Sequence, residues 1–349
     1  CLNVKLFGII PLRSMRVNVL PEVHVYPGGQ AIGVLLKSQG VMVVGNSFVK
    51  TEQGKCFPAQ NAGIKVGDII LKINDNKVNS KVKLSHLIQK YSENNSKISL
   101  LIKRKSGERQ KINIKPVKNV KGQYMIGLYV DDGVSGVGTL TFYDPETRQY
   151  GALGHVVTET QSHKKIDVRK GKIVEAQISG INTGQQGIPG QKQGSFFNYQ
   201  NTVLGNINKN TKFGIYGSLN KIPENPYFDN KIPVATISQV RKGPAQVYTV
   251  INGGKIEKFN IKIERIFRQN RPDSKGMVLN ITDNRLKKMT GGIIQGMSGS
   301  PIVQDDKLVG AITHVFINNP TKGYGVFAEW MLRETEILEQ MNPKKAVNF

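Results

Sequence analysis

Ser298 is the residue of this chain best placed to act as a nucleophile. It lies in the segment Gln295-Gly296-Met297-Ser298-Gly299-Ser300-Pro301, where small neighbours would expose a side chain at the tip of a tight turn. Glycine at position 296 allows the backbone N–H groups of Gly296 and Ser298 to point into one cavity, as an oxyanion hole requires. The segment alone is also compatible with a Gly/Ser-rich turn that has no catalytic role, so the prediction depends on a partner base.

A serine needs a general base, and His155 is the strongest candidate. The other histidines are His24, His86, His163 and His314. Residues 135–158 alternate apolar and small residues around a Pro-containing turn at 144–147, which predicts a β-hairpin. The hairpin ends in a histidine that directly follows Gly154. This position at a strand end favours His155 as the base.

A carboxylate is expected to hold the imidazole in one tautomer and to stabilise its positive charge. Four aspartates lie between the base and the nucleophile: Asp167, Asp229, Asp273 and Asp283. Asp229 and Asp273 lie in Asn/Pro-rich stretches that are typical of solvated turns. Asp167 lies among basic residues and is expected on the surface. Asp283 follows an apolar strand predicted at 276–282, where a buried carboxylate could be presented, and is therefore favoured.

Together these segments resemble the stage IV sporulation protein B (SpoIVB) serine peptidase family. The resemblance rests on Gly-Ala-Leu-Gly-His155, on a strand that ends in Thr-Asp283, and on Gly-Met-Ser298-Gly-Ser-Pro-Ile. The N-terminal half agrees, with Pro-Gly-Gly-Gln-Ala-Ile-Gly-Val at 27–34 and Gly-Val-Met-Val-Val-Gly at 40–45. The similarity covers nearly the whole chain. The serine and histidine segments are also similar to those of chymotrypsin-like proteases.

The resemblance implies a serine endopeptidase with an Asp283–His155–Ser298 triad and an oxyanion hole formed by the N–H groups of Gly296 and Ser298. It implies a sporulation role, in which the protein is exported across the forespore membrane into the intermembrane space and is anchored to the membrane. There it would cleave itself near the N-terminus. It would also cleave a regulatory membrane protein, which triggers processing of a mother-cell sigma factor. We expect neither a metal nor another cofactor.

Residues 30–117 are predicted to form a PDZ domain in front of the protease domain. The string from Pro58 to Asn76, with Gly-Asp ahead of an apolar strand, resembles PDZ domains of bacterial proteases. Residues 82–91 have helical spacing, and 98–102 would close the sheet. His86 on this helix either contacts a ligand or is simply exposed.

The PDZ domain is expected to bind a peptide that adds as a strand beside residues 33–36. The backbone N–H groups of Ile32, Gly33 and Val34 would then hold a terminal carboxylate. The peptide would be the protein's own arm or the end of a partner. The alternative is a PDZ fold that only braces the protease domain.

The 349 residues suffice for two domains. We predict a mainly β protein, with an N-terminal arm at 1–29, an α+β PDZ domain at 30–117 and a chymotrypsin-like double β-barrel at 118–349. The sequence has no run of about 18 uncharged apolar residues that could span a membrane. The chain begins without Met, which is consistent with a removed signal peptide, a membrane anchor or an arbitrary start of the sequence. The family resemblance implies an upstream membrane anchor.

The net charge is +24, from 49 basic and 25 acidic residues. The basic residues are scattered and do not form a motif with aromatic residues, so we expect no nucleic-acid partner. An anionic membrane surface is the favoured electrostatic partner. The two cysteines, Cys1 and Cys56, make neither a disulfide framework nor a metal-binding pattern.

Two other functions fit parts of the sequence. A non-catalytic PDZ scaffold would explain the front module, but the presence of both His155 and Ser298 argues against a decayed barrel. An HtrA-like quality-control protease has both modules, but it carries the PDZ domain after the catalytic domain. An α/β-hydrolase is rejected because its histidine must follow the serine at a distance, whereas His314 follows Ser298 too closely.

Overall fold

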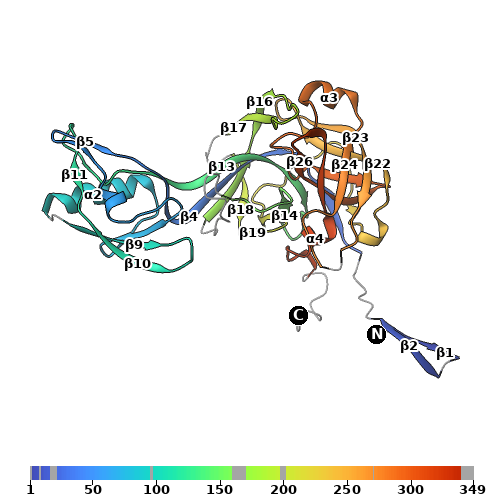
Figure 1. Ribbon diagram of the computed structural model, residues 1–349. Coiled ribbons are helices and arrows are strands. Elements are labelled where there is room, and N and C mark those ends of the chain that lie inside the picture. The colour runs from blue at the N-terminus through green and yellow to red at the C-terminus, as the bar shows by residue number, and fades with distance from the viewer. Residues whose placement is uncertain are drawn as a thin grey trace.

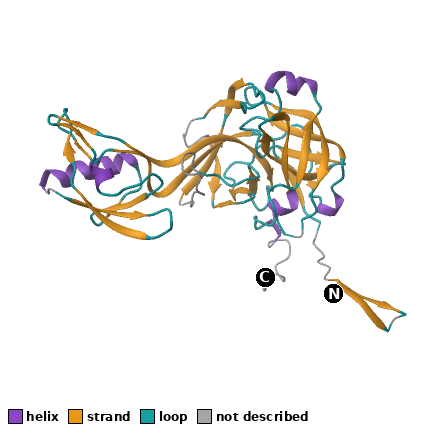
Figure 2. Cartoon of the chain, viewed as in Figure 1, coloured by secondary structure: helices purple, strands orange, loops and turns teal. Residues whose placement is uncertain are grey.

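The computed structural model describes residues 2–7, 9–15, 22–94, 97–158, 170–196, 202–269 and 271–338. These residues form two lobes that are joined by the long strands β4 (Ala31–Asn46) and β13 (Leu128–Tyr143) (Figure 1). Strands dominate both lobes (Figure 2). No helix in the described ranges is long and apolar enough to cross a membrane. The predicted mainly β class is confirmed.

The C-terminal part of the larger lobe is a closed antiparallel barrel. Its strands, in order around the barrel, are β22 (Gly243–Val250), β23 (Ile256–Ile266), β24 (Met277–Ile281), β27 (Asn319–Phe327), β26 (Lys307–Phe316) and β25 (Pro301–Gln304). Buried and more exposed residues alternate along β24, as expected for a strand with one face on the core. The helices of this part are α3 (Asn284–Thr290), α4 (Ala328–Leu332) and the 3-10 helix η2 (Ile237–Gln239).

The second part of the larger lobe is also a ring of strands. These are the first half of β4, the second half of β13, β14 (Gln149–Ala152), β20 (Gly214–Ser218), β18 (Val203–Ile207) and β15 (Lys170–Glu175). A bridge between Gly205 and Leu219 connects β18 to the β20 side, and β15 pairs with β4. The core of this ring contains Ile32, Leu140 and Ile215. The predicted double barrel is therefore present.

Short elements complete the chain. They are β1 (Leu2–Leu6), β2 (Ile10–Met15), β3 (His24–Pro27), β16 (Gln177–Asn182), β17 (Gln191–Ser195), β19 (Lys209–Thr211) and β21 (Ile232–Pro233). β1 and β2 form a hairpin, whereas β3 pairs with β13 and β21. The end of the predicted arm therefore packs on the larger lobe.

The smaller lobe has its own core, which extends from Val41 to Ile126. Its elements are the second half of β4, β5 (Val49–Thr51), β6 (Gly54–Cys56), α1 (Pro58–Asn61), β7 (Ile69–Ile73), β8 (Asn76–Lys77), α2 (Lys81–Asn94), β9 (Ile98–Lys103), β10 (Arg109–Ile114), β11 (Val117–Lys118), β12 (Tyr124–Met125) and the start of β13. Helix α2 buries Leu84, Leu87 and Ile88, which lie on one helical face.

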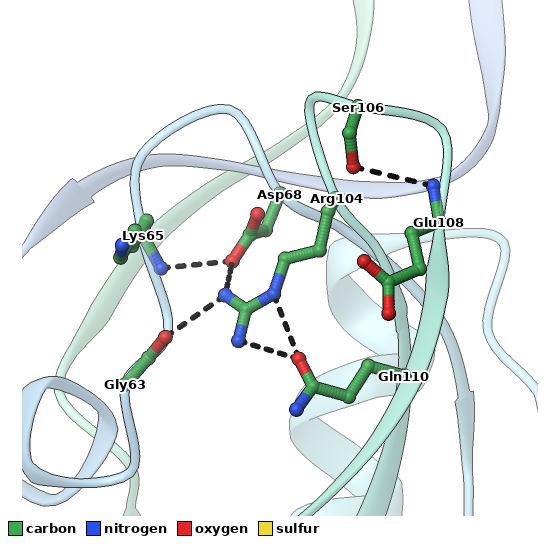
Figure 3. A network of polar contacts seen from close by, with 7 residues as sticks. All are labelled: Gly63, Lys65, Asp68, Arg104, Ser106, Glu108 and Gln110. Atoms are coloured by element: carbon green, nitrogen blue, oxygen red, sulfur yellow. Dashed lines mark hydrogen bonds and ion pairs between the residues drawn. The ribbon is translucent and has the colours of Figure 1, made fainter.

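A partly buried ion pair fixes the turn in front of β7 in the smaller lobe (Figure 3). The Nη1 atom of Arg104 lies 2.6 Å from Oδ2 of Asp68, a carboxylate that also accepts the backbone N–H of Lys65. The same guanidinium donates to the carbonyl of Gly63 and to the side-chain oxygen of Gln110. The aspartate of the predicted Gly-Asp motif therefore holds the loop, because its carboxylate binds Lys65 within the same turn and Arg104 just after β9.

The predicted peptide-binding residues Ile32, Gly33 and Val34 are in the wrong place for that role. They lie in the middle of a sheet, where β13 pairs with one edge of β4 and β15 pairs with the other. All three are buried. Because both neighbours already use the backbone hydrogen-bonding groups of this segment, neither a peptide strand nor a carboxylate can be added to it. The prediction is corrected: these residues build the barrel.

Gly33 provides a test of this placement. A Cβ atom at position 33 would lie 2.6 Å from Cγ of Phe196 and 2.7 Å from Cγ2 of Val174. We expect Gly33→Val to lower the free energy of unfolding by about 1–3 kcal/mol, because overpacking displaces both side chains. The control is Gly136→Val on the paired strand, where a Cβ meets nothing within 4 Å. Equal denaturation midpoints for both variants would place Gly33 outside the core.

Candidate active site

Ser298 lies on a tight turn between α3 and β25. Gly296 and Gly299 on either side have φ angles of 92° and 91°, a left-handed conformation that favours glycine. The N–H of Met297 donates to the carbonyl of Ile294 at 3.1 Å, and the N–H of Ser300 donates to the carbonyl of Met297 at 2.9 Å. These bonds close the turn, as the small residues around Ser298 predicted.

The other barrel anchors this turn through strand β13. The backbone N–H of Thr139 donates to the carbonyl of Ser298 at 3.0 Å, and its hydroxyl donates to the carbonyl of Gly296 at 2.9 Å. Two positions along, the hydroxyl of Thr141 donates to the carbonyl of Gly299 at 2.8 Å. Both threonines are fully buried. The nucleophile turn is therefore fixed by hydrogen bonds between the two barrels.

His155 follows β14 after a sharp change in chain direction. Leu153 and Gly154 have φ angles of 71° and 72°, so two consecutive residues are left-handed. The N–H of Leu153 donates to the carbonyl of Thr139 at 3.2 Å. The same Thr139 residue thus holds the histidine turn with its carbonyl and the serine turn with its N–H.

The side chains of His155 and Ser298 converge on one stretch of β26. The hydroxyl of Ser298 donates to the carbonyl of Thr313 at 2.9 Å, and the His155 ring centroid lies 5.2 Å from that of His314. Among the hydrogen bonds of the described residues, none joins Ser298 to His155. Rotation about χ1 of Ser298 would release Thr313 and let the hydroxyl turn to another acceptor. The predicted nucleophile and base are brought to the same site.

The hydrogen bond of His155 identifies its tautomer. Its Nδ1 lies 2.9 Å from the carbonyl oxygen of Val156, which can only accept, so Nδ1 carries the proton and Nε2 is the free base. Burial lowers the pKa of His155, and the bond to Val156 opposes that effect. The pKa of His314 is lowered to about 4 by partial burial and by its neighbours His155 and Lys275. Both imidazoles are therefore neutral near pH 7.

The predicted oxyanion hole has its donors available. Within the described part of the chain, no hydrogen bond engages the backbone N–H of Gly296 or of Ser298, whereas the N–H groups of Met297, Gly299 and Ser300 are all engaged. The two unengaged groups flank one residue of a turn whose φ angle at Gly296 is 92°. Their role as oxyanion donors stays a prediction, and the hydrogen bonding leaves them able to fulfil it.

The structure does not bring Asp283 to His155. Its carboxylate is the N-cap of α3 and accepts the backbone N–H of Arg285 at 2.9 Å and of Asn260 at 3.3 Å. It also pairs with the Arg285 guanidinium at 3.0 Å, and this hydrogen-bonded ion pair lowers the pKa of Asp283.

The register of the barrel separates Asp283 from the histidines. His314 pairs with Tyr324, which pairs with Val278 at the start of β24. Asp283 lies beyond the far end of β24, and a strand rises about 3.3 Å per residue, so the carboxylate is remote from the His155–His314 contact.

None of the other aspartates is shown to hold the histidine. Asp229 is exposed, and Asp273 pairs with Lys212 at 3.6 Å. Asp167 lies outside the described residues. Sequence reasoning also missed Thr139 and Thr313, because no local pattern marks a threonine as an anchor for a segment far along the chain.

Two substitutions separate the capping role of Asp283 from the predicted catalytic role. Asp283→Asn keeps an N-cap acceptor for Arg285 but loses the ion pair and the second acceptor oxygen, so we expect a smaller loss of stability than in the alanine variant and nearly unchanged activity. Asp283→Ala removes the cap and should lower the free energy of unfolding by about 1 kcal/mol. Denaturant titration and kcat measure the two effects. A fall in kcat of about 10⁴ in Asp283→Asn without loss of stability would establish the predicted triad acid instead, and would require the site to rearrange.

Two family models match the chain, one after the other. A model of the SpoIVB peptidase S55 family matches residues 122–332, more than half of the chain, and a PDZ domain model matches residues 32–115. No curated protein matches the chain. Among solved structures, the active form of the Rv3671c protease from M. tuberculosis is 14% identical with a TM-score of 0.32, over 58% of this chain and 73% of that one. An inactive form of that protease is 14% identical with a TM-score of 0.30, over 56% of this chain and 81% of that one.

Proposed function

The chain belongs to the SpoIVB peptidase S55 family of serine proteases, and from that premise we propose that Ser298 is its nucleophile and His155 its general base. The observation that carries the assignment is the convergence of both residues on Thr313 and His314, between two barrels that are hydrogen-bonded to each other through Thr139. The neutral state of His155 and its Nδ1–H tautomer supply the free base that this chemistry needs.

In the proposed mechanism the Ser298 hydroxyl turns from the Thr313 carbonyl to Nε2 of His155, which takes its proton as the oxygen attacks the scissile carbonyl. The N–H groups of Gly296 and Ser298 stabilise the oxyanion. His155 then protonates the leaving amine, and an acyl-enzyme remains on Ser298. Water, deprotonated by His155, releases the acyl group and restores the hydroxyl. The Val156 carbonyl holds the imidazole throughout and stabilises its charged form.

We further propose the biological role that members of this family have. The protein cleaves a regulatory membrane protein in sporulation signalling and also cleaves itself near the N-terminus. It acts between the forespore and mother-cell membranes, held there by an anchor outside this sequence. Family membership supports the role, and the net charge of +24 supports contact with an anionic membrane surface.

For the PDZ domain, which implies peptide binding, we propose that the peptide adds to β13 rather than to residues 32–34. Over 128–138, β13 pairs with β4 along one edge, and no described strand pairs with its other edge. Helix α2 lies beside this strand: the backbone N–H of Lys81, at the start of the helix, donates to the carboxylate of Asp132. Farther along the helix, the side chain of Gln89 forms hydrogen bonds with both the N–H and the carbonyl of Tyr124. An edge strand beside a helix is the arrangement that β-strand addition uses.

Hydrogen exchange tests this location. A peptide that binds the PDZ domain should slow exchange of the amides in 128–136 that face away from β4, because they gain partners. Amides of Ile32, Gly33 and Val34 should exchange slowly with or without the peptide. Protection that appears at residues 32–34 and not at 128–136 would return the site to the predicted loop.

Ser298→Ala tests the catalytic assignment. We expect the variant to lose peptide hydrolysis and self-cleavage by about 10⁴ to 10⁶-fold, with an unchanged denaturation midpoint, because only one hydroxyl is removed. Labelling by a fluorophosphonate should also disappear. Ser106→Ala is the matched control, since Ser106 is an exposed serine of the smaller lobe. Turnover by Ser298→Ala at the wild-type rate would favour a non-catalytic scaffold or a different nucleophile.

A further inference from the structure

Lys192 is a buried lysine, and no carboxylate of the described residues pairs with it. It lies on β17, opposite Ile181 of β16, and is 2% exposed. The hydrogen bond of its amine goes to a neutral hydroxyl, Oγ1 of Thr249, at 2.8 Å. Burial of an ammonium with only neutral partners is costly, so a lysine in this position requires an explanation.

The backbone and stem of Lys192 support the turn that carries the oxyanion donors. Its N–H donates to the carbonyl of Gln295 at 2.9 Å, and the N–H of Gln295 donates to the carbonyl of Gly190 at 2.8 Å. A Cβ at Gly296 would lie 3.0 Å from Cδ and 3.1 Å from Cβ of Lys192. The aliphatic stem is thus packed directly against the α-carbon of Gly296.

The amine of Lys192 ends in a chain of buried hydroxyl groups that returns to the same turn. Thr249 accepts from Lys192 and also from the hydroxyl of Ser300 at 2.9 Å. The Ser300 hydroxyl also lies 3.4 Å from that of Thr139, which donates to the carbonyl of Gly296 at 2.9 Å. Lys192 is therefore connected to Gly296 in two ways: its aliphatic side chain packs on Gly296, and its amine is linked to the Gly296 carbonyl through the hydroxyls of Thr249, Ser300 and Thr139.

We propose that Lys192 is a positioning residue of the oxyanion hole: its stem and its amine together fix the orientation of the Gly296 turn. The inference rests on the proposed function, because it assigns Lys192 a role in stabilising the oxyanion of that reaction. The geometry selects a positioning role over a catalytic one, because Lys192 is buried and its amine donates to the buried hydroxyl of Thr249.

The ionisation of Lys192 should make kcat depend on pH. Burial lowers its pKa to about 7, and no charged group of the described residues contributes to this shift. The amine donates to the hydroxyl of Thr249 on β22, and the hydroxyls of Ser300 in the 295–300 turn and of Thr139 on β13 continue the chain of hydrogen bonds. Below the folded pKa the ammonium donates firmly to Thr249 and places positive charge behind the oxyanion donors. As pH rises through that pKa, this charge is lost, and kcat should fall.

The free energy of unfolding should rise with pH, whereas kcat should fall. The folded pKa lies below that of an unfolded lysine, so the unfolded state binds more protons between about pH 7 and 10.4, and the cost of burying Lys192 diminishes as pH rises through this range. A neutral side chain of similar shape removes that cost. Loss of a purely structural residue would lower stability and activity together, whereas loss of Lys192 should lower activity alone.

The experiment compares Lys192→Met with the wild type and with Lys172→Met, an exposed lysine of β15. Active sites are titrated to completion with a fluorophosphonate, and kcat and KM of a short unstructured peptide are measured per titrated site. We expect Lys192→Met to lower kcat about tenfold to a hundredfold, since loss of an oxyanion donor costs about 10² to 10³, with KM within about twofold. Its melting temperature should be equal or higher, and the fall of kcat above pH 7 should disappear. Lys172→Met should match the wild type.

A wild-type kcat per site with an unchanged pH profile in Lys192→Met would overturn the proposal. If Lys192→Met does not fold, Thr249→Val is the second variant, because it keeps the Lys192 side chain and removes the hydroxyl that binds the amine. It should lower kcat by about the same tenfold to hundredfold. An unchanged kcat in Thr249→Val would also overturn the proposal. Ser298→Ala, measured in parallel, distinguishes a failure of the proposed function from a failure of the role proposed for Lys192. Turnover by Ser298→Ala refutes the proposed function, whereas an inactive Ser298→Ala beside a fully active Lys192→Met refutes only the role of Lys192.

Discussion

The backbone hydrogen bonds of Thr139 are the interaction on which the site depends. Its N–H binds the serine turn, its carbonyl binds the histidine turn, and its hydroxyl binds the carbonyl of Gly296. The nucleophile segment belongs to the C-terminal barrel, and Thr139 belongs to the other barrel. A peptide bond can be hydrolysed only when both turns are held at a fixed separation, since small displacements are costly in catalysis. The docking of the two barrels is therefore a catalytic requirement and not only a matter of stability.

The same strand connects this anchor to the smaller lobe. β13 is continuous from Leu128 to Tyr143, and it pairs with β4 along both halves. The lobes are thus joined by two hydrogen-bonded strands and not by a flexible linker. A peptide added at 128–136 would lie on the strand that carries Thr139. This continuity is a physical connection between a peptide site and the serine turn, and measured coupling between them is what would make it allosteric.

Local signals in the sequence predicted the parts of the site that depend on local geometry. The glycines around Ser298 have the φ angles that such a turn needs, and the hairpin before His155 forms. Partners across the barrels were not predictable, because an apolar Ile-Gly-Val segment fits the edge strand of a PDZ domain and the centre of a barrel equally well. The N-cap role of Asp283 did have a signal. A helix-compatible stretch follows it and ends at Gly291-Gly292, which is the pattern of a capped helix.

Lys192 shows why a buried polar group escapes sequence reasoning. Glutamines and glycines surround it in the sequence, and in this context a lysine is expected to be solvated. Only the fold places β17 beneath the Gly296 turn and Thr249 opposite the amine. An apolar residue of similar shape would fill that space at lower cost, so selection for stability alone would not retain a lysine there. Lys192 lies against the turn that carries the oxyanion donors. Because its burial costs stability, we attribute its position to its role in that turn.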